Sequence, residues 1–357
     1  MNIIETAPIL RGYTYNGNSS SIVHYVEHLD EPEISCKIED LKKLIKPTTK
    51  SVYIEEVGSF LIGTDYDEAI TQIFKSTSLI GREAIVNNKV VIVTGGAQGF
   101  GEGIVKGLCK KGALVFIADI NLDGAKSLAE EINKEENRTV AFPVLCNVTD
   151  EESVKSMVKY VVKKVGGIDI LISNAGVLKA GSVKTISKED FEFVTDVNYI
   201  GFFLCTKHIA PVMERMNKPT GKYSTDIISI TSKSALEGSN RNSAYSGSKF
   251  GSIGLVQSFA KELIEDNTKV NSICPGNFFD GPLWSDPNNG LFVQYLKSGK
   301  VPNATTVDEV RQYYESQIPM KRGCSIDDIL KAILYLVEQE YETGQALPVT
   351  GGQVMLN

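Results

Sequence analysis

Seven short apolar runs, separated by stretches of helical periodicity, occupy the chain from residue 89 onward. Val, Ile and Leu fill these runs almost without interruption, which is typical of parallel strands buried on both faces of a sheet. The runs are residues 89–94, 113–119, 139–148, 167–176, 225–232, 269–276 and 346–352. The sequence therefore predicts a doubly wound α/β domain over residues 89–357, with a parallel sheet of about seven strands.

Residues 1–88 do not follow this alternation. The stretch 51–63 predicts two strands that turn near Glu56–Gly58. The stretch 65–83 predicts one amphipathic helix that begins at Asp65. We therefore expect residues 1–88 to form a small α+β appendage that packs against the main domain.

The composition argues against several classes of protein. A net charge of -7 and a pI near 5.3 oppose binding to nucleic acid, which needs a basic face. No run approaches the roughly 18 apolar residues of a membrane span, and residues 1–17 lack a basic region followed by an apolar core. The six Cys form no C-x-x-C pair, so we expect reduced, buried thiols. These features predict a cytoplasmic protein without nucleic-acid or membrane partners.

A glycine-rich turn follows the first run of the main domain. The segment "TGGAQGFG" places Thr94, Gly95, Gly99 and Gly101 in a T-G-x-x-x-G-x-G frame. Glycines let backbone N–H groups approach a pyrophosphate, which then lies at the N-terminus of the next helix. Such a turn alone is weak evidence, but its position between a strand and a helix favours a dinucleotide site.

Asp119 ends the second run, where a carboxylate can bind both hydroxyls of an adenosine ribose and repel a 2′-phosphate. No Arg or Lys lies in the glycine turn or at Ile120 and Asn121, which directly follow Asp119. The alternative is an exposed Asp at a strand end. The pattern favours NAD over NADP as the cofactor.

Small or polar residues also follow the third and fourth runs. Asn147 and Val148 follow the third, and Asn174, Ala175 and Gly176 follow the fourth. Ligands of open α/β sheets bind in the crevice at the carboxyl ends of the strands. Four consecutive strand ends of this kind therefore predict one continuous binding crevice.

A proton-transfer group is expected in "TSKSALEGSNRNSAYSGSK", residues 231–249. If residues 243–265 form a helix, Tyr245 and Lys249 lie on one face, and Ser232 ends the preceding strand. Lowering the pKa of a phenol by about 3 units needs roughly 4 kcal/mol, part of which the Lys249 ammonium can supply. Most isolated Tyr-x-x-x-Lys pairs are solvated helix faces, but Ser232 and the glycine turn favour a catalytic site, with Ser232 bonded to the substrate oxygen.

These segments resemble the short-chain dehydrogenase/reductase family. The matching pieces are "TGGAQGFG", "SNAG", Asn198 in "DVNYIG", Ser232, "YSGSK" and "PG" (275–276). The resemblance implies a Rossmann-type fold and a homo-oligomer, a dimer or a tetramer. It implies that Tyr245 is the general acid/base, that Lys249 also binds the nicotinamide ribose, that Ser232 orients the substrate oxygen and that Asn198 holds a relay water. The cofactor contacts that it implies are Gly95, Gln98, Gly99, Phe100, Gly101, Asp119, Ile120, Asn147, Val148, Asn174, Ala175, Gly176, Tyr245, Lys249, Pro275 and Gly276.

A narrower likeness is to the branch of this family that acts on sorbitol 6-phosphate. It is carried by residues 231–251, "GNFFDGPLW", "QYYESQIPMKRGC" and "ETGQALPVTGGQVM". This likeness implies NAD-dependent interconversion of a hexitol phosphate and fructose 6-phosphate. A sugar phosphate needs cations near Tyr245, and Lys233, Arg241, Lys321 and Arg322 are the candidates, although each is equally typical of a surface charge.

Two positions depart from the family pattern. Asn147 stands where many relatives carry Asp, and Asp280 stands where many carry a Thr that contacts the nicotinamide amide. The long segment 277–323, which contains Phe278, Phe279, Trp284 and Tyr295, is typical either of a lid or of a buried helix pair.

The N-terminal segment, notably "YIEEVGSFLIGTDYDEA", resembles the tail of a class II, zinc-dependent sugar-phosphate aldolase. The metal site of those aldolases needs a His-x-His pair, whereas this chain has only His24, His28 and His208. We therefore expect no metal and a non-catalytic role in packing or assembly.

Three other functions stay open at this point. The first is a dehydrogenase of an unphosphorylated polyol or another secondary alcohol. The second is a non-catalytic NAD(H)-binding redox sensor, which the combination of Asn198, Ser232, Tyr245 and Lys249 opposes. The third is an aldolase fused to a dehydrogenase, which the missing metal ligands oppose.

Overall fold

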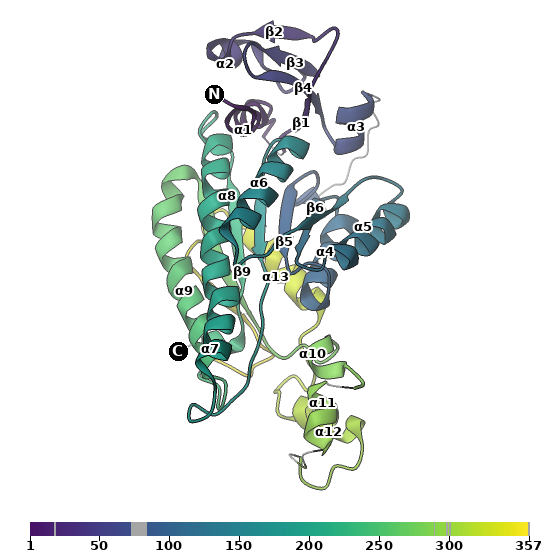
Figure 1. Cartoon of the computed structure of the whole chain (residues 1–357), viewed down its shortest axis with the longest axis vertical. Helices are drawn as coiled ribbons and strands as arrows, with labels where there is room; N and C mark the ends of the chain where they lie inside the picture. Colours follow the sequence, from purple (N-terminus) through teal and green to yellow (C-terminus); the bar gives the residue numbers. More distant parts are fainter. Residues whose placement is uncertain (18, 73–83, 289, 298, 300, 356–357) are drawn as a thin grey trace.

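A parallel sheet forms the centre of the chain in a computed structural model that describes residues 1–17, 19–72, 84–288, 290–297, 299 and 301–355 (Figure 1). Within these residues the sheet has seven strands in the order β11-β10-β9-β8-β5-β6-β7, and every neighbouring pair is parallel. The strands are β5 (Val90–Thr94), β6 (Leu114–Asp119), β7 (Ala141–Leu145), β8 (Ile170–Ser173), β9 (Thr225–Ile230), β10 (Thr268–Pro275) and β11 (Ala346–Val349). The predicted Rossmann-type fold is confirmed, and the strand order reverses between β5 and β8.

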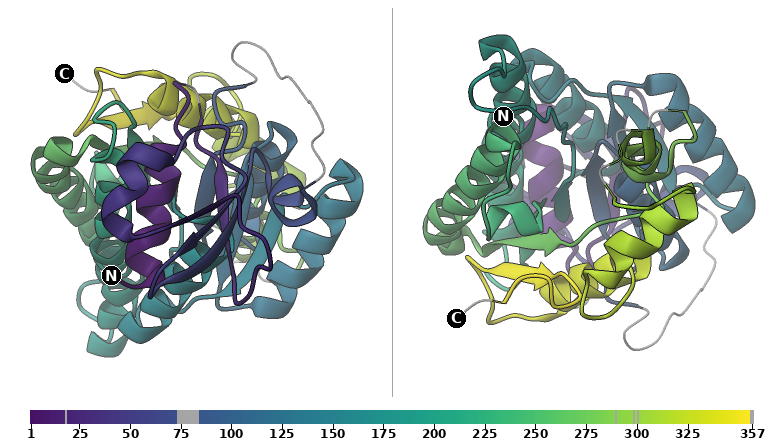
Figure 2. Two further views of the ribbon diagram at one scale, coloured as in Figure 1. Left: turned by 90° about the horizontal axis from the view of Figure 1, so that it is seen from above. Right: turned by 90° about the horizontal axis from the view of Figure 1, so that it is seen from below.

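Helices cover both faces of this sheet (Figure 2). One face packs against α4 (Gly99–Lys110), α5 (Leu122–Glu136) and α13 (Ile326–Glu338), and the other packs against α6 (Glu151–Val165), α8 (Gly201–Asn217) and α9 (Ser243–Leu263). The helix α7 (Lys188–Thr195) leads through a π-helical turn over Asp196–Ile200 into α8. Burial on both faces explains why the strands carry few polar residues.

The N-terminal segment has its own sheet, whose four described strands are ordered β1-β4-β3-β2. Its elements are α1 (Ile3–Tyr13), β1 (Ile22–Val26), β2 (Ile34–Cys36), α2 (Leu41–Leu44), β3 (Ser51–Ile54), β4 (Gly58–Gly63) and α3 (Tyr66–Thr71). The predicted turn at Glu56–Gly58 is confirmed, because β3 and β4 pair antiparallel around Glu56 at φ 64°. The predicted helix begins at the N-cap Asp65 as expected but ends at Thr71, because Gln72 adopts a left-handed conformation; residues 73–83 of that prediction lie outside the described residues.

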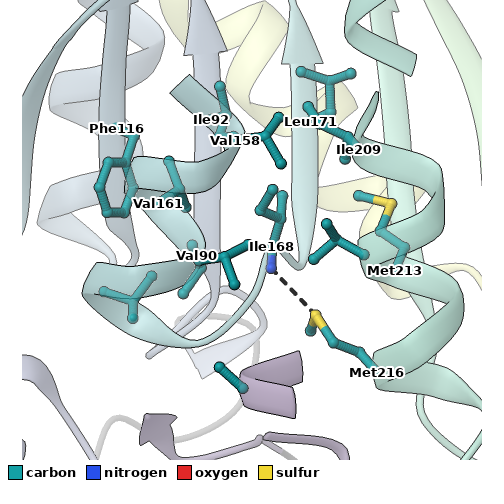
Figure 3. Packing of buried hydrophobic residues seen from close by; sticks show 14 of the residues in the cluster. Val90, Ile92, Phe116, Val158, Val161, Ile168, Leu171, Ile209, Met213 and Met216 are labelled. Atoms are coloured by element: carbon teal, nitrogen blue, oxygen red, sulfur yellow. Dashed lines mark hydrogen bonds between the residues drawn. The ribbon is translucent and has the colours of Figure 1, made fainter. Parts of the chain in front are cut away.

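Helix α1 fastens the N-terminal segment to the main domain. The buried guanidinium of Arg11 lies 2.6 Å from the carboxylate of Asp169, which directly precedes β8. A Cβ at Gly12 would lie 2.4 Å from the carbonyl oxygen of Met216 in α8, so only glycine permits this close approach. Figure 3 shows the adjoining core, where the N–H of Ile168 donates to the Sδ of Met216 at 3.2 Å. One hydrophobic cluster thus runs from the N-terminal segment into the main domain.

The described residues of the segment 277–323 form three short helices at the opposite end of the molecule from the N-terminal sheet (Figure 1). These are α10 (Pro282–Ser285), α11 (Leu291–Lys297) and α12 (Val307–Ser316). They enclose a small core of their own, built from Phe279, Phe292, Val301, Val310 and Ile318. Helices α11 and α12 pack against each other around this core, and both expectations for the segment, a lid and a packed helix pair, stay predictions.

The six Cys are buried and unpaired, as predicted. Among the described helices, none combines the length and the apolar character that crossing a bilayer would need.

Candidate active site

A large cleft lies at the carboxyl ends of the strands, where the strand order reverses between β5 and β8. Its volume is about 1660 Å³. Most of the residues that the sequence singled out line it, namely Gly95, Gln98, Gly99, Phe100, Asp119, Ile120, Asn147, Val148, Asn174, Ala175, Gly176, Ser232, Lys233, Arg241, Tyr245, Lys249, Pro275 and Gly276. The predicted residues Gly101, Asn198, Lys321 and Arg322 are not among the lining residues.

The glycine turn is tight enough to exclude side chains at two positions. Gly95 has φ +61°, and a Cβ there would lie 2.9 Å from the Cα of Ala175. A Cβ at Gly101 would lie 2.0 Å from the carbonyl oxygen of Gly95. Gly101 therefore packs against the turn on the side away from the cleft and does not line the cleft. Helix α4 begins at Gly99, which does line the cleft. This arrangement fits a pyrophosphate at the N-terminus of α4.

Asn174 holds the turn against the end of β8. Its Nδ2 donates to the carbonyl oxygens of Thr94, at 3.1 Å, and Gly95, at 3.0 Å. The Oγ1 of Thr94 accepts in return from the backbone N–H groups of Asn174 and Ala175, each at 3.0 Å. These four bonds fix the turn before any ligand binds, which lowers the ordering cost of binding.

Asp119 is 8% exposed and is bonded on both carboxylate oxygens. Oδ2 accepts from the N–H of Ala97 at 3.0 Å, and Oδ1 accepts from the N–H of Asn121 at 2.9 Å. The alternative of an exposed strand-end Asp does not hold. Ile120 beside it is 70% exposed and offers no cation. Asn147 is engaged within its own loop, because its Oδ1 accepts from the N–H of Thr149 at 3.1 Å.

Ser232, Tyr245 and Lys249 come together in the cleft. Burial raises the pKa of the Tyr245 phenol, and a hydrogen bond with Ser232 opposes that rise. In the chain alone desolvation outweighs the hydrogen bond, so the lowered pKa that the sequence predicts, with Lys249 supplying only part of the effect, stays a prediction for the complex with cofactor.

Lys249 is 5% exposed, and burial lowers its pKa to about 8. Its Nζ donates to the carbonyl oxygen of Ile230 at 2.9 Å and lies 5.8 Å from the centre of the Tyr245 ring. The ammonium is therefore anchored on β9, beside the phenol rather than in solvent.

Asn198 lies in the π-helical turn behind the cleft, and its side chain is fully engaged there. Its Oδ1 accepts from the N–H of Val177 at 2.8 Å, and its Nδ2 donates to the carbonyl oxygen of Val177 at 3.0 Å and to Ser248 Oγ at 3.1 Å. Ser248 Oγ donates to the carbonyl oxygen of Tyr245 at 2.8 Å. Sequence reasoning missed Ser248, although its place in "YSGSK", beside Lys249, was a usable signal. Asn198 therefore braces the helix that carries Tyr245.

The four predicted cations divide into two pairs. Lys233 and Arg241 line the cleft, and neither has an ion-pair partner among the described residues. Lys321 instead donates to the carbonyl oxygen of Ser316 at 2.6 Å, and Arg322 pairs with Asp328 at 2.6 Å. The structure thus does not bring Lys321 and Arg322 to Tyr245, because local partners hold both side chains.

Sequence reasoning also missed Lys184, an exposed cation that lines the cleft together with Lys233, Arg241 and Lys249. Asp280, which departs from the family pattern, does not line the cleft, and its carboxylate pairs with Arg311 at 2.8 Å. Trp284, Tyr295 and Tyr314 of the segment 277–323 also line the cleft.

The chain is similar to several known proteins. A family model described as short chain dehydrogenase matches residues 89–285. Sorbitol-6-phosphate 2-dehydrogenase of Escherichia coli (strain K12) is 37% identical over 271 residues, which are 75% of this chain and 99% of that relative.

The chain is also similar to solved structures of dehydrogenases. The crystal structure of sorbitol-6-phosphate 2-dehydrogenase from Erwinia amylovora superposes with a TM-score of 0.68 and 36% identity, over 75% of this chain and 100% of that chain. The structure of an NAD+-bound xylitol dehydrogenase has a TM-score of 0.66 and 28% identity, over 75% of this chain and 99% of that chain. Residues 1–88 precede the part that the family model matches. The chain therefore belongs to the short chain dehydrogenase family and is an oxidoreductase that acts on alcohol groups.

Proposed function

We propose that this enzyme is an NAD-dependent dehydrogenase that interconverts sorbitol 6-phosphate and fructose 6-phosphate. The observation that carries the proposal is that Lys233 and Arg241, without ion-pair partners among the described residues, line the same cleft as Tyr245. A phosphorylated polyol can thus reach the phenol with its alcohol group and the cations with its phosphate. The 37% identical sorbitol-6-phosphate 2-dehydrogenase supports the same substrate.

The proposal that the cofactor is NAD and not NADP depends on Asp119, at the end of β6. The glycine turn fits a dinucleotide because a Cβ at Gly95 or Gly101 would collide with backbone atoms. Asp119 can accept hydrogen bonds from both ribose hydroxyls, whereas a 2′-phosphate would face its carboxylate without a cation at Ile120 or Asn121. The NAD+-bound xylitol dehydrogenase supports this choice.

NAD held by the glycine turn and Asp119 would supply a hydride acceptor in the direction of alcohol oxidation and a hydride donor in the reverse direction. Tyr245 receives the alcohol proton in one direction and donates it in the other. Ser232 hydrogen-bonds the substrate oxygen and the phenol, so the two oxygens meet at a fixed distance. Lys249 favours the phenolate while its ammonium is charged, and Asn198 holds helix α9 in register behind Tyr245.

An initial-rate comparison tests the proposal. The substrates are sorbitol 6-phosphate and free sorbitol, each with NAD and with NADP. We expect the highest catalytic efficiency for sorbitol 6-phosphate with NAD. Equal efficiency on the two polyols would end the phosphate assignment, and equal efficiency with both cofactors would end the assignment of Asp119.

An unphosphorylated polyol is the second candidate substrate. The 28% identical xylitol dehydrogenase favours it, since that enzyme's name carries no phosphate. The same assay decides, because a free-polyol enzyme would oxidise sorbitol or xylitol at least as well as sorbitol 6-phosphate.

Two further expectations belong to this proposal. We expect a cytoplasmic homo-oligomer, which the family membership and the exposed Phe203 and Phe250 on α8 and α9 support. The appendage, residues 1–88, is expected to be non-catalytic, and its likeness to an aldolase tail stays a prediction. Light scattering on the purified chain measures the assembly.

A further inference from the structure

Two aromatic side chains of the segment 277–323, Trp284 on α10 and Tyr314 on α12, line the cleft that contains Tyr245. Both are half-buried, and their ring centres lie 5.2 Å apart. In the described part of the chain, neither Trp284 Nε1 nor Tyr314 Oη has a hydrogen-bond partner, and neither atom is shielded from solvent. Such N–H and O–H groups usually find a partner when the ring is buried, so this pair offers two polar groups that a ligand in the cleft can reach.

The two rings are held in place by the small core of the segment 277–323. The Trp284 ring lies 5.1 Å from the ring of Phe292, which is 2% exposed, and Tyr314 packs against the same core from α12. Arg311, one turn before Tyr314, pairs with Asp280 at 2.8 Å and so fastens α12 to the chain that leads into α10. Side chains that are already fixed lose little conformational freedom when a ligand binds. The pair is therefore ordered before the substrate arrives.

The chemistry of the pair selects the kind of group it can bind. Burial raises the pKa of Tyr314 to about 12, so its phenol is uncharged at neutral pH. An indole N–H only donates, whereas a phenol O–H both donates and accepts, as a hydroxyl group does. A phosphate forms stronger bonds with cations, which Lys233 and Arg241 supply in the same cleft. The uncharged pair is therefore better suited to hydroxyl groups on a carbon chain.

We propose that Trp284 and Tyr314 bind hydroxyl groups of the polyol chain beyond the reacting carbon and so select long polyols over short alcohols. This inference rests on the proposed function for the placement of the reacting carbon at Tyr245. An uncharged pair makes the same bonds to a free and to a phosphorylated polyol. It thus adds a selection for chain length to the selection for phosphate by the cations.

The fluorescence of Trp284 tests the proposal without turnover, because Trp284 is the only Trp in the chain. The Tyr245→Phe protein, saturated with NAD, is titrated with sorbitol 6-phosphate, with sorbitol and with inorganic phosphate. We expect a saturable change in Trp emission with each polyol and none with inorganic phosphate. No change with sorbitol 6-phosphate at concentrations well above the parent's KM would overturn the proposal. A change with inorganic phosphate alone would also overturn it, because the phosphate would then lie at Trp284.

The variants Trp284→Phe and Tyr314→Phe each keep a ring and remove one polar group. We expect each to raise KM by about 2- to 12-fold for sorbitol 6-phosphate and for sorbitol, with kcat unchanged, since a remote hydroxyl is bound equally before and during hydride transfer. The KM for 2,3-butanediol, which has no chain beyond its diol, should not change. An equal rise for 2,3-butanediol, or a rise only in the KM for NAD, would overturn the proposal.

The matched control is Tyr313→Phe, which removes the same hydroxyl group from the neighbouring residue of α12. Tyr313 is 42% exposed and does not line the cleft, so every KM should stay unchanged. A rise in Tyr313→Phe equal to that in Tyr314→Phe would show an effect on the helix and overturn the proposal. If the parent does not oxidise sorbitol 6-phosphate, the proposed function fails, while the fluorescence titrations with sorbitol and xylitol still decide the role of Trp284 and Tyr314.

Discussion

Arg11 and Asp169 are 158 residues apart in the sequence, yet they form an ion pair at 2.6 Å in which both side chains are 0% exposed. Asp169 Oδ2 also accepts from the N–H of Val90, and Arg11 Nη1 donates to the carbonyl oxygen of Ser21 at 2.7 Å. One buried charge pair thus joins the N-terminal helix to the start of two central strands.

Breaking this pair should destabilise the whole chain. Arg11→Met leaves the Asp169 carboxylate buried without its cation, so we expect a loss of about 3–5 kcal/mol in the free energy of unfolding. Chemical denaturation measures it. The control is Lys188→Met, which removes an exposed ion pair with Glu192 and should cost less than about 1 kcal/mol. Comparable losses in the two variants would show that the buried pair has no special role.

Tyr245→Phe should cut turnover by far more than tenfold while NAD binding persists, because only the proton donor is removed. Steady-state kinetics and a cofactor-binding titration give the two readings. A variant that kept more than about a tenth of the parent's turnover would exclude Tyr245 from proton transfer.

The buried ammonium of Lys249 should lower the free energy of unfolding at neutral pH, compared with a chain that has no charge at this position. Burial lowers its pKa to about 8, so between pH 8 and its unfolded pKa the unfolded chain binds a proton that the native chain does not. Parent stability should therefore rise with pH across that window, relative to a variant without this group. Since one pKa unit corresponds to about 1.4 kcal/mol, Lys249→Met should stabilise the protein by roughly 1–3 kcal/mol at pH 7 and lose activity.

Thermal melts of parent and Lys249→Met from pH 7 to pH 10.5 provide the measurement. The gain should shrink as the pH rises above 8. Lys155→Met, at a half-buried site on α6 where the ammonium pairs with Glu152, is the control and should show no such trend. A gain that is the same at every pH would contradict the buried-charge explanation.

Asp119 should decide the cofactor preference. Asp119→Ala combined with Ile120→Arg removes the carboxylate and adds a cation for a 2′-phosphate, so we expect a shift from NAD toward NADP. Because Asp119 also binds the N–H groups of Ala97 and Asn121, the single variant Ile120→Arg separates cofactor choice from damage to the turn. An unchanged ratio of NAD to NADP efficiency in the double variant would remove Asp119 from this role.

The phosphate proposal predicts that Lys233→Ala or Arg241→Ala loses efficiency on sorbitol 6-phosphate but not on sorbitol. A charge-assisted bond is worth about 1.5–3 kcal/mol, or roughly 10- to 150-fold in kcat/KM. The Lys321→Ala/Arg322→Ala double variant is the control, because both side chains bind elsewhere. The parent could prefer sorbitol 6-phosphate while only the Lys321→Ala/Arg322→Ala control loses efficiency on that substrate alone. In that case Lys233 and Arg241 do not bind the phosphate.

The sequence was sufficient for the central sheet and for most of the cleft. Strands such as β5 and β6 are buried along their whole length, so burial alone selects apolar residues such as Val and Ile there. The glycine turn and the pair Tyr245–Lys249 are local patterns, and their spacing in the chain fixes their spacing in space.

Contacts that depend on the tertiary fold could not be predicted in this way. No local pattern links Arg11 to Asp169. In the sequence, Lys321 and Arg322 are candidates for a phosphate site on the same grounds as Lys233. In the structure, the carbonyl oxygen of Ser316 binds Lys321 and the carboxylate of Asp328 binds Arg322. The pKa of Tyr245 likewise depends on burial, which the residues near it in sequence do not report.

The docking of α1 depends on residues that are translated much later than α1 itself. Residues 3–13 are translated well before Asp169 and Met216, which contact them in the folded chain. At about 5–20 residues per second, Arg11 waits roughly 8–32 s for Asp169. During that interval α8 is not yet made, so α1 lacks the helix that it packs against and completes its native docking only later.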